Sequence, residues 1–261
     1  MLKAEALTIS YDTREVIKDL DLEVPRSQVT AIIGPNGCGK STLLRALARL
    51  LSPNRGSVTL DGTELQSLSP RKLARRLAIL PQHLHAPEGI RVSDLVMRGR
   101  IPWRSFLSIW RDEDRDACEA ALRAVGMQDH ADRDLSELSG GQRQRAWLSL
   151  VLAQQTPYLL LDEPTTYLDL THQMEVLRLL RRLNQHSGTT VVSVLHDLNL
   201  AARYSDHLVL LGKGELVATG RPTDVLTQKN LAYAFGLDAQ VIADPITHTP
   251  LVVPLEPEDD R

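Results

Sequence analysis

The fold of this chain is decided by the stretch Gly34-Pro35-Asn36-Gly37-Cys38-Gly39-Lys40-Ser41-Thr42. A glycine, four free positions and then Gly-Lys-Ser form the pattern of a loop that cradles phosphate groups. The β-branched, apolar residues 29–33 before this loop predict a buried strand. Residues 42–51 after it carry apolar side chains at helical spacing. A chance glycine turn before an ordinary helix is the alternative, but the order strand, loop and helix favours phosphate binding.

The residue types of this loop indicate its chemistry. Glycines let successive N–H groups point at phosphate oxygens, and the N-terminus of the following helix adds a partial positive charge. Lys40 is placed to reach the outer phosphates, and the Ser41 hydroxyl is placed to ligate Mg²⁺. We therefore expect a nucleoside triphosphate as the ligand, bound by residues 34–42.

Length and composition restrict the class of protein. With 261 residues, 43% of them hydrophobic and 24% charged, the chain fits one large soluble domain or one domain with an inserted subdomain. A formal net charge of -3 gives no support to a nucleic-acid partner. Cys38 and Cys118 are too few for a disulfide framework, so we expect free thiols in a reducing cytosol.

Nothing in the sequence predicts a membrane span. The N-terminus lacks a signal-peptide pattern, and no apolar run approaches the roughly 20 residues that a membrane-crossing helix needs. If the chain serves a membrane, we expect it to dock on a partner that spans it.

Two carboxylates follow a second apolar run, Leu159-Leu160-Leu161-Asp162-Glu163-Pro164. Such a run predicts a buried strand, and ligands of open α/β folds bind at the carboxyl ends of their strands. Asp162 is suited to hold Mg²⁺, directly or through water, and Glu163 is suited to orient and deprotonate an attacking water. An acidic strand end before a proline often has no function. We therefore give this pattern a functional interpretation because the phosphate loop is also present.

The rest of the chain alternates between strand and helix patterns. Strands are expected within residues 1–30 and over 57–62, 77–80, 158–161 and 189–195. The last two runs are apolar or β-branched throughout, so both faces should be buried in a parallel sheet. Helices are expected from about 88 to 156, with one over 112–125, and as a crossover over 172–185; residues 208–218 predict a hairpin.

A third signal is Leu138-Ser139-Gly140-Gly141-Gln142, before an apolar helical stretch. Ser139 can cap that helix, and the two glycines leave N–H groups open at its positive end. The arrangement can form a second anion site. For this pattern alone, a well-capped ordinary helix is the stronger alternative.

Together the three motifs resemble those of the ATP-binding cassette (ABC) ATPases, and the resemblance covers nearly the whole chain. It implies an α/β fold: a P-loop NTPase (RecA-like) core with an N-terminal antiparallel β-subdomain and an inserted α-helical subdomain. The core then comprises residues 1–87 and 157–261, with a C-terminal extension, and the helical subdomain comprises residues 88–156. The implied cofactors are ATP and Mg²⁺, and the implied activity is ATP hydrolysis.

The resemblance also implies roles for single residues. Tyr11 is expected to stack on adenine, and Gln82 to sense Mg²⁺ and the attacking water from a loop that faces a membrane partner. His196 is expected to contact the γ-phosphate, which makes it catalytic together with Glu163, Lys40 and Gln82. Leu168-Asp169 is expected to link two active sites.

Each of these residues has an ordinary alternative. Tyr11 fits a strand edge, Gln82 a loop cap and His196 a strand end. His83 and His85 lack partners at ligand spacing, so we interpret them as solvated loop residues. The aromatic residues of the helical part are expected in the core or facing a partner rather than stacking on bases; they are Trp103, Phe106 and Trp110.

The family implies a partner copy. In ABC ATPases the phosphate loop of one chain faces the signature of another, so a homodimer is expected. ATP on one copy would then contact residues of the other, namely Ser139, Gly140, Gly141 and Gln142. Hydrolysis removes this bridge and opens the dimer.

Three segments, residues 162–169, 196–199 and 244–254, are similar to those of bacterial importers of ferric siderophores, whose relatives also take up haem and vitamin B12. In that subgroup the ATPase lies at the cytoplasmic face of the membrane (the inner membrane in Gram-negative cells), under a permease that a binding protein feeds. Tyr167 stands where many siderophore members carry tryptophan, which bears on the substrate and not on the ATPase activity. Residues 244–254 are expected to serve C-terminal packing.

The leading hypothesis is therefore an ATPase subunit that powers uptake of an iron chelate. A haem or cobalamin importer is the alternative within the subgroup. A soluble ABC protein acting on DNA or ribosomes usually has a long coiled-coil insertion or two cassettes, and this chain has neither. A P-loop GTPase or small-molecule kinase leaves residues 138–142 and His196 unexplained, and no Asn-Lys-x-Asp motif is present.

Overall fold

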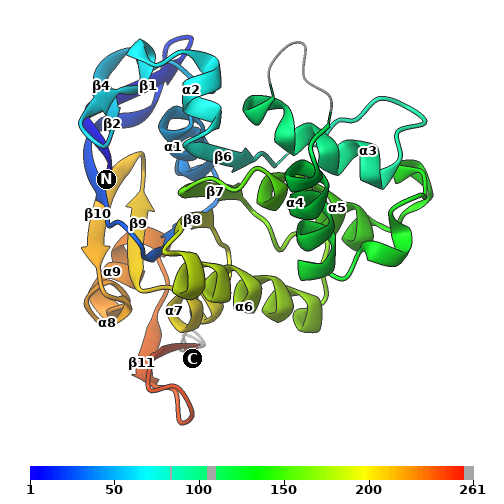
Figure 1. Ribbon diagram of the computed structural model, residues 1–261. Helices are drawn as coiled ribbons and strands as arrows, with labels where there is room; N and C mark the ends of the chain where they lie inside the picture. The colour runs from blue at the N-terminus through cyan, green and yellow to red at the C-terminus, as the bar shows by residue number, and fades with distance from the viewer. Residues whose placement is uncertain (83, 105–109, 256–261) are drawn as a thin grey trace.

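A computed structural model describes residues 1–82, 84–104 and 110–255 of the chain. Its centre is a six-stranded sheet in the order β10-β9-β3-β8-β7-β6 (Figure 1). The strands are β3 (Val29–Ile33), β6 (Leu77–Leu80), β7 (Tyr158–Asp162), β8 (Thr190–Val194), β9 (His207–Gly212) and β10 (Glu215–Gly220). All neighbouring strands pair in parallel except β9 and β10, which pair antiparallel.

Helices cover both faces of this sheet. Ile32 of β3 packs with Leu43 of α1 (Lys40–Leu47), whereas Ile33 packs with Leu177 of α6 (Leu170–Ser187). Successive side chains of a strand point to opposite faces, so α1 and α6 lie on opposite sides. Every residue of β7 and β8 is buried. The two predicted buried parallel strands and the crossover helix between them are therefore confirmed.

A second, antiparallel sheet in the order β2-β1-β4-β5 covers α1 from above in Figure 1. Its strands are β1 (Leu2–Tyr11), β2 (Arg14–Val24), β4 (Arg55–Leu60) and β5 (Thr63–Glu64), followed by η1 (Leu65–Ser67) and α2 (Pro70–Ala74). Ile9 and Ile17 of this sheet share a core cluster with Leu44 of α1. This packing brings the turn between β1 and β2 close to the start of α1.

Helical elements extend beyond β6, on the right in Figure 1. They are α3 (Val92–Met97), η2 (Arg98–Trp103), α4 (Asp112–Ala124), η3 (Gln128–His130), η4 (Leu135–Glu137) and α5 (Gly140–Ala153). The helix predicted over 112–125 is confirmed as α4. Helical and strand residues share one cluster, in which Leu95 and Leu148 pack with Leu80 and Leu161. The subdomain boundaries at residues 87/88 and 156/157 stay a prediction.

The C-terminal part packs against β3, β9 and β10 of the sheet. It contains α7 (Leu198–Tyr204), α8 (Pro222–Val225), α9 (Gln228–Phe235) and the hairpin of β11 (Ala239–Ala243) and β12 (Pro250–Pro254). The hairpin predicted at Gly212-Lys213-Gly214 is confirmed: Lys213 and Gly214 both have positive φ, 54° and 84°, as a two-residue turn between twisted strands needs.

One helix differs from its prediction. The helix expected over 42–51 runs from Lys40 to Leu47. Arg49 takes a left-handed conformation with φ of 58°, which L-residues cannot continue as a helix, so the apolar pattern extends beyond the end of the helix. Among the described residues, no helix is both long and apolar enough to cross a lipid bilayer.

Candidate active site

The phosphate loop connects β3 to α1 and leaves the start of α1 open. Gly39 is the N-cap, in a left-handed conformation with φ of 106°, and no side chain caps the helix. The first turn of α1 also has no acidic residue. The free N–H groups and the positive end of the helix dipole are therefore available to an anion.

Two glycines of the loop are required by close packing as well as by conformation. Gly34 has φ of 150°, and a Cβ there would lie 2.4 Å from the Leu211 carbonyl oxygen. A Cβ on Gly39 would lie 2.7 Å from Ile17 Cδ1. Because the neighbours are β9 and β2, the loop is held against both sheets.

Lys40 is buried and bonded within the loop. Its Nζ donates hydrogen bonds to the carbonyl oxygens of Gly34 (2.8 Å) and Pro35 (2.9 Å). An ammonium group has three donors, so one remains for a phosphate oxygen. Cys38 lies buried beneath the loop as a free thiol, and burial raises its pKa. Cys118 is likewise buried and free.

Ser41 at the start of α1 and Asp162 at the end of β7 bring together two oxygen atoms that could bind a metal ion. The Ser41 hydroxyl donates to Asp162 Oδ1 at 2.8 Å, although 121 residues separate them in the sequence. Burial raises the pKa of Asp162, and the Ser41 hydrogen bond opposes this rise. A hydroxyl and a carboxylate that face one anion-binding loop are hard oxygen donors of the kind that Mg²⁺ prefers.

Glu163 is held by hydrogen bonds at both carboxylate oxygens. His196 Nε2 lies 2.7 Å from Oε1, and the Thr166 hydroxyl donates to Oε2 at 3.1 Å. Burial acts to raise the pKa of Glu163, but hydrogen bonds from His196, Thr166 and Gln82 outweigh it and hold this pKa below its ordinary value. Glu163 is therefore ionised at neutral pH. It also has φ of 53°, a strained conformation for a non-glycine residue.

Lys40, Ser41, Glu163 and His196 line one cavity of about 860 Å³. Ten residues predicted from the sequence lie in its wall: Tyr11, Asn36, Gly37, Gly39, Lys40, Ser41, Thr42, Gln82, Glu163 and His196. Four other predicted residues contact this wall without lining the cavity. Lys40 bonds to Gly34 and Pro35, and Ser41 bonds to Asp162. Cys38 packs next to Gly34. The roles assigned to single residues stay predictions.

Four lining residues were missed as site residues by the sequence analysis. They are Asp12, Thr13, Arg14 and Val16, from the turn and strand that follow Tyr11. Only their proximity to Tyr11 in the sequence could have indicated them.

The signature residues do not line this cavity. Ser139 caps α5 as predicted: its hydroxyl accepts from Gln142 N at 3.3 Å, and the Gln142 side chain accepts from Ser139 N at 3.1 Å. A Cβ on Gly141 would lie 3.0 Å from Leu168 Cδ2, so the signature packs against the loop after β7. Within that loop Tyr167 is 85% exposed, which is exceptional for an aromatic side chain.

The signature and the loop that contains Leu168-Asp169, which were both expected to act between two active sites, lie next to each other. Gln144 of α5 donates to the Pro164 carbonyl at 3.3 Å, which joins the signature helix to the end of β7. Asp169 caps α6 through His172 N at 2.9 Å. The signature and the loop that contains Leu168-Asp169 form one surface outside the cavity.

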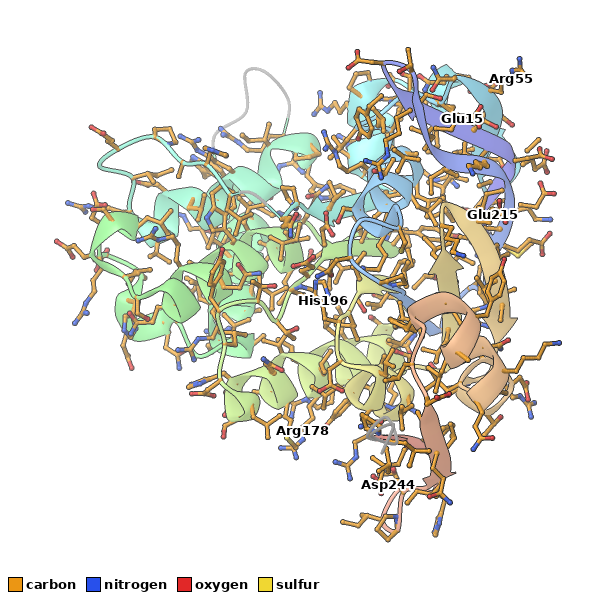
Figure 2. All side chains as sticks on the ribbon, turned by 180° about the vertical axis from the view of Figure 1, so that it is seen from behind. Glu15, Arg55, Arg178, His196, Glu215 and Asp244 are labelled. Atoms are coloured by element: carbon orange, nitrogen blue, oxygen red, sulfur yellow. The ribbon has the colours of Figure 1, made fainter. Side chains whose placement is uncertain are left out.

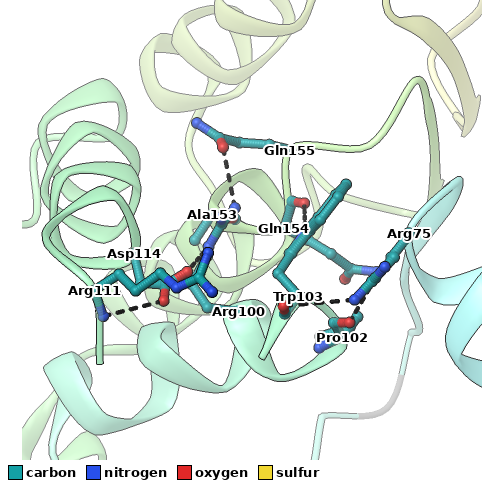
Figure 3. Close-up of polar contacts among 9 residues, drawn as sticks. All are labelled: Arg75, Arg100, Pro102, Trp103, Arg111, Asp114, Ala153, Gln154 and Gln155. Carbon is teal, nitrogen blue, oxygen red and sulfur yellow. Dashed lines mark hydrogen bonds and ion pairs between the residues drawn. The ribbon is translucent and has the colours of Figure 1, made fainter. Parts of the chain in front are cut away.

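Trp103 and Trp110, the two of the three predicted aromatic residues that the structure describes, each pack with arginine side chains. The Trp103 ring lies between the guanidinium groups of Arg75 and Arg100, 5.3 and 5.5 Å from its centroid, and its Nε1 donates to the Gln154 carbonyl at 2.7 Å (Figure 3). Arg100 in turn forms a buried ion pair with Asp114 at 2.9 Å. Arg104 lies 3.9 Å from the Trp110 ring centroid.

The remaining predictions concern the histidines and Phe106. His85 is exposed, in agreement with a solvated loop residue. His83 and Phe106 lie outside the described residues. Within the described ranges, no group of three or more His, Cys, Asp or Glu side chains could hold a metal ion. A site for Mg²⁺ needs no such group, because nucleotide phosphates and water supply most ligands.

Comparison with known proteins agrees with this geometry. A family model described as ABC transporter matches residues 17–166. The petrobactin import ATP-binding protein FpuD of Bacillus anthracis is 49% identical over 97% of this chain and 93% of its own length. The ferric enterobactin transport ATP-binding protein FepC of Escherichia coli is 48% identical over 97% of this chain and 94% of its own.

A solved structure shows the same fold. The dimeric structure of MJ0796, a bacterial ABC transporter cassette, aligns with a TM-score of 0.77 and 26% identity, covering 85% of this chain and 98% of that one. The family match spans more than half of the residues, and two relatives match along nearly their whole length. The chain belongs to the ABC transporter family, as one of its ATPases.

Proposed function

We propose that this chain is the ATP-hydrolysing subunit of an importer that takes up an iron chelate of the ferric siderophore class. The activity is inferred from one observation: Lys40, Ser41, Glu163 and His196 all line the same cavity. The substrate class is supported by the relatives, which serve import of petrobactin and transport of ferric enterobactin.

The residues of the cavity fit a magnesium nucleotide. The open start of α1 and the third donor of Lys40 suit the outer phosphates, and Tyr11 suits the adenine. Ser41 and Asp162 would hold Mg²⁺, with Gln82, which lines the same cavity and hydrogen-bonds to Glu163, as a further oxygen donor. The bound ion neutralises phosphate charge.

Glu163 and His196 suit the hydrolytic step. An ionised Glu163 can accept a proton from water, but both of its oxygens are engaged in this structure. If His196 turns to donate to the terminal phosphate, Oε1 becomes free for the attacking water. The same movement would stabilise the charge that develops on the phosphate.

A second copy completes the site. The cavity lacks the signature, whose residues Ser139 to Gln142 lie on a separate surface next to the exposed Tyr167. A two-fold dimer would bring each signature to the nucleotide of the other copy, and the similar cassette MJ0796 is a dimer. A structure with Mg²⁺ and a non-hydrolysable ATP analogue, in which Ser139 of neither copy approached the terminal phosphate, would contradict this arrangement.

The dimer would act at the cytoplasmic face of the membrane. We infer that integral permease subunits dock near the exposed Gln82 and that a substrate-binding protein acts indirectly, through the permease. No nucleic-acid partner is proposed, because the chain has a formal charge of -3.

Uptake by the intact complex tests the function. The permease is identified by co-purification, and the complex is reconstituted in vesicles with labelled ferric siderophores, haem and cobalamin. ATP-dependent uptake of a ferric siderophore is expected. Uptake of haem or cobalamin alone would overturn the substrate class, and purification without any membrane partner would support a soluble ABC protein.

A further inference from the structure

The C-terminal hairpin is fastened to α7 by a side-chain amide. Asn199 Oδ1 accepts from Val252 N at 2.8 Å, and Asn199 Nδ2 donates to the Val252 carbonyl oxygen at 3.3 Å. A neighbouring strand would satisfy the same two backbone groups. Asn199 therefore takes the place of a strand beside β12, and α7 is bonded directly to the hairpin.

A second contact lies one helical turn further along α7. Arg203 is four residues after Asn199, so both side chains lie on one face of the helix. Arg203 Nη2 lies 3.7 Å from Asp244 Oδ2 in the hairpin turn. Asp244 itself fixes this turn, because its Oδ1 accepts from Ile246 N and Thr247 N at 2.8 and 2.9 Å.

The short helix α7 depends on such contacts. It has seven residues, and isolated helices shorter than about 12 residues are marginal in water. Its buried residues are Ala201, Ala202 and Tyr204, two of which bury only a methyl group. The hairpin is itself anchored in the core, since Ala239 and Val252 are buried in the cluster that contains these residues.

The beginning of α7 carries the active-site histidine. Asp197 is the N-cap of α7, and its Oδ1 accepts from Leu200 N at 2.8 Å. His196 directly precedes this cap, and its side chain is 48% exposed. The imidazole is held at its tip by the 2.7 Å contact with Glu163 Oε1 and is otherwise little packed, so its position also depends on the backbone that joins β8 to α7. Figure 2 shows His196 near the middle of the molecule and Asp244 at the end of the hairpin.

We propose that the C-terminal hairpin positions His196, and that Asn199 is the positioning residue that transmits this restraint through α7. The inference rests on the proposed role of His196 in hydrolysis. It also relates two of the segments that resemble siderophore importers, since residues 196–199 and 244–254 are in contact here. The hairpin then has a function beyond C-terminal packing.

The test compares three substitutions in the full-length protein. Asn199→Ala removes both hydrogen bonds, and Asn199→Asp keeps the acceptor for Val252 N while losing the donor. Asn230→Ala is the matched control, because Asn230 Nδ2 donates to the Val225 carbonyl at 2.9 Å, so this amide bonds within the segment of α8 and α9 rather than to α7 or the hairpin. Phosphate release gives kcat and KM, calorimetry gives the Kd for ATP, and thermal unfolding gives Tm.

A positioning role predicts a specific pattern. Asn199→Ala should lower kcat by about threefold to tenfold with an unchanged Kd, short of the roughly hundredfold that a 1 Å misplacement can cost. Asn199→Asp should also lower kcat with an unchanged Kd, because its second carboxylate oxygen would face the Val252 carbonyl oxygen, and it gives a second reading if the alanine variant folds poorly. Asn230→Ala should lower Tm and leave kcat unchanged.

Other outcomes overturn the inference. A lowered Tm with wild-type kcat in both Asn199 variants would show that the hairpin serves stability alone, as would equal losses of kcat in Asn199→Ala and Asn230→Ala. His196→Ala separates the two hypotheses. If His196→Ala loses activity while Asn199→Ala keeps it, the hairpin inference fails and the proposed hydrolytic role stands. Wild-type turnover by His196→Ala would overturn the role of His196 itself and, with it, any positioning of that residue.

Discussion

Replacement of Glu163 by glutamine isolates the chemical step from nucleotide binding. The amide has nearly the size of the carboxylate, and its oxygen can still accept the hydrogen bond that Thr166 donates at 3.1 Å. What it loses is the negative charge, and with it the capacity to take a proton from water. The wall of the cavity and the phosphate loop, including Lys40 and Ser41, stay as they are.

The size of the effect follows from the role of the carboxylate. Its lowered pKa means that Glu163 is ionised in the wild type at neutral pH, so the substitution removes the proposed base in its active, ionised form. A positioned general base contributes about 10² to 10⁴ in rate, which corresponds to about 3 to 5 kcal/mol of transition-state stabilisation. We expect kcat to fall by that factor and the Kd for ATP to change by less than about threefold, or under 1 kcal/mol.

Three measurements check this prediction. Phosphate release gives kcat, calorimetry gives the Kd for ATP, and gel filtration with ATP and Mg²⁺ should show a dimer that the slowed hydrolysis preserves. Glu215→Gln is the matched control, because Glu215 is exposed at the start of β10, away from the cavity (Figure 2). Hydrolysis by Glu163→Gln at the wild-type rate would refute the assignment of the base.

Three further predictions concern binding and stability. Lys40→Ala should weaken ATP binding by about 10-fold to 150-fold, the value of charge-assisted hydrogen bonds, and unchanged calorimetric affinity would refute the phosphate contact. Gly34→Ala should weaken ATP binding and lower Tm more than Gly37→Ala, because only the first Cβ collides, at 2.4 Å from Leu211 O; equal effects would contradict the packing argument. Asp61→Asn should lower the free energy of unfolding at pH 7 by about 1 to 3 kcal/mol. Burial acts to raise the pKa of Asp61, but hydrogen bonds from the Met1 amino group, Tyr158 and Arg76 lower it to about 2. Since this pKa lies below the unfolded value of about 3.8, the contribution is complete above that pH and declines as the pH falls toward 2. Urea unfolding at pH 7 and pH 3 should show the difference between the two proteins shrink, and a constant difference would contradict the ionic origin.

The sequence predicts those parts of the site whose structure depends only on residues close to one another in the chain. The phosphate loop, the carboxylates at the end of β7 and the cap at Ser139 each follow from neighbours within a few residues, and the structure contains all three. The turn at Lys213 and Gly214 follows from the requirement for positive φ.

The parts that the sequence does not predict depend on contacts between distant segments. Arg14 and Val16 line the cavity only because the antiparallel sheet packs over α1, and no local pattern records that packing. The early end of α1 at Leu47 depends on the backbone of Arg49, against an apolar pattern that continues to Leu51. The bond between Asn199 and Val252 spans 53 residues, so sequence periodicity alone gave the hairpin no role.

The separation of cavity and signature within one chain explains how the two sites of the proposed dimer would act together. Gly141 packs on Leu168, and Gln144 bonds to Pro164, so the signature is fixed to the loop that follows Glu163. A partner nucleotide that engaged the signature would therefore bear on the loop beside Glu163, the proposed catalytic base of the same copy. The exposed Tyr167 lies on this surface, where a second copy would remove it from water. Each chain would thus sense the nucleotide of its partner through the same residues that complete the partner's site, and this would couple the two hydrolysis events.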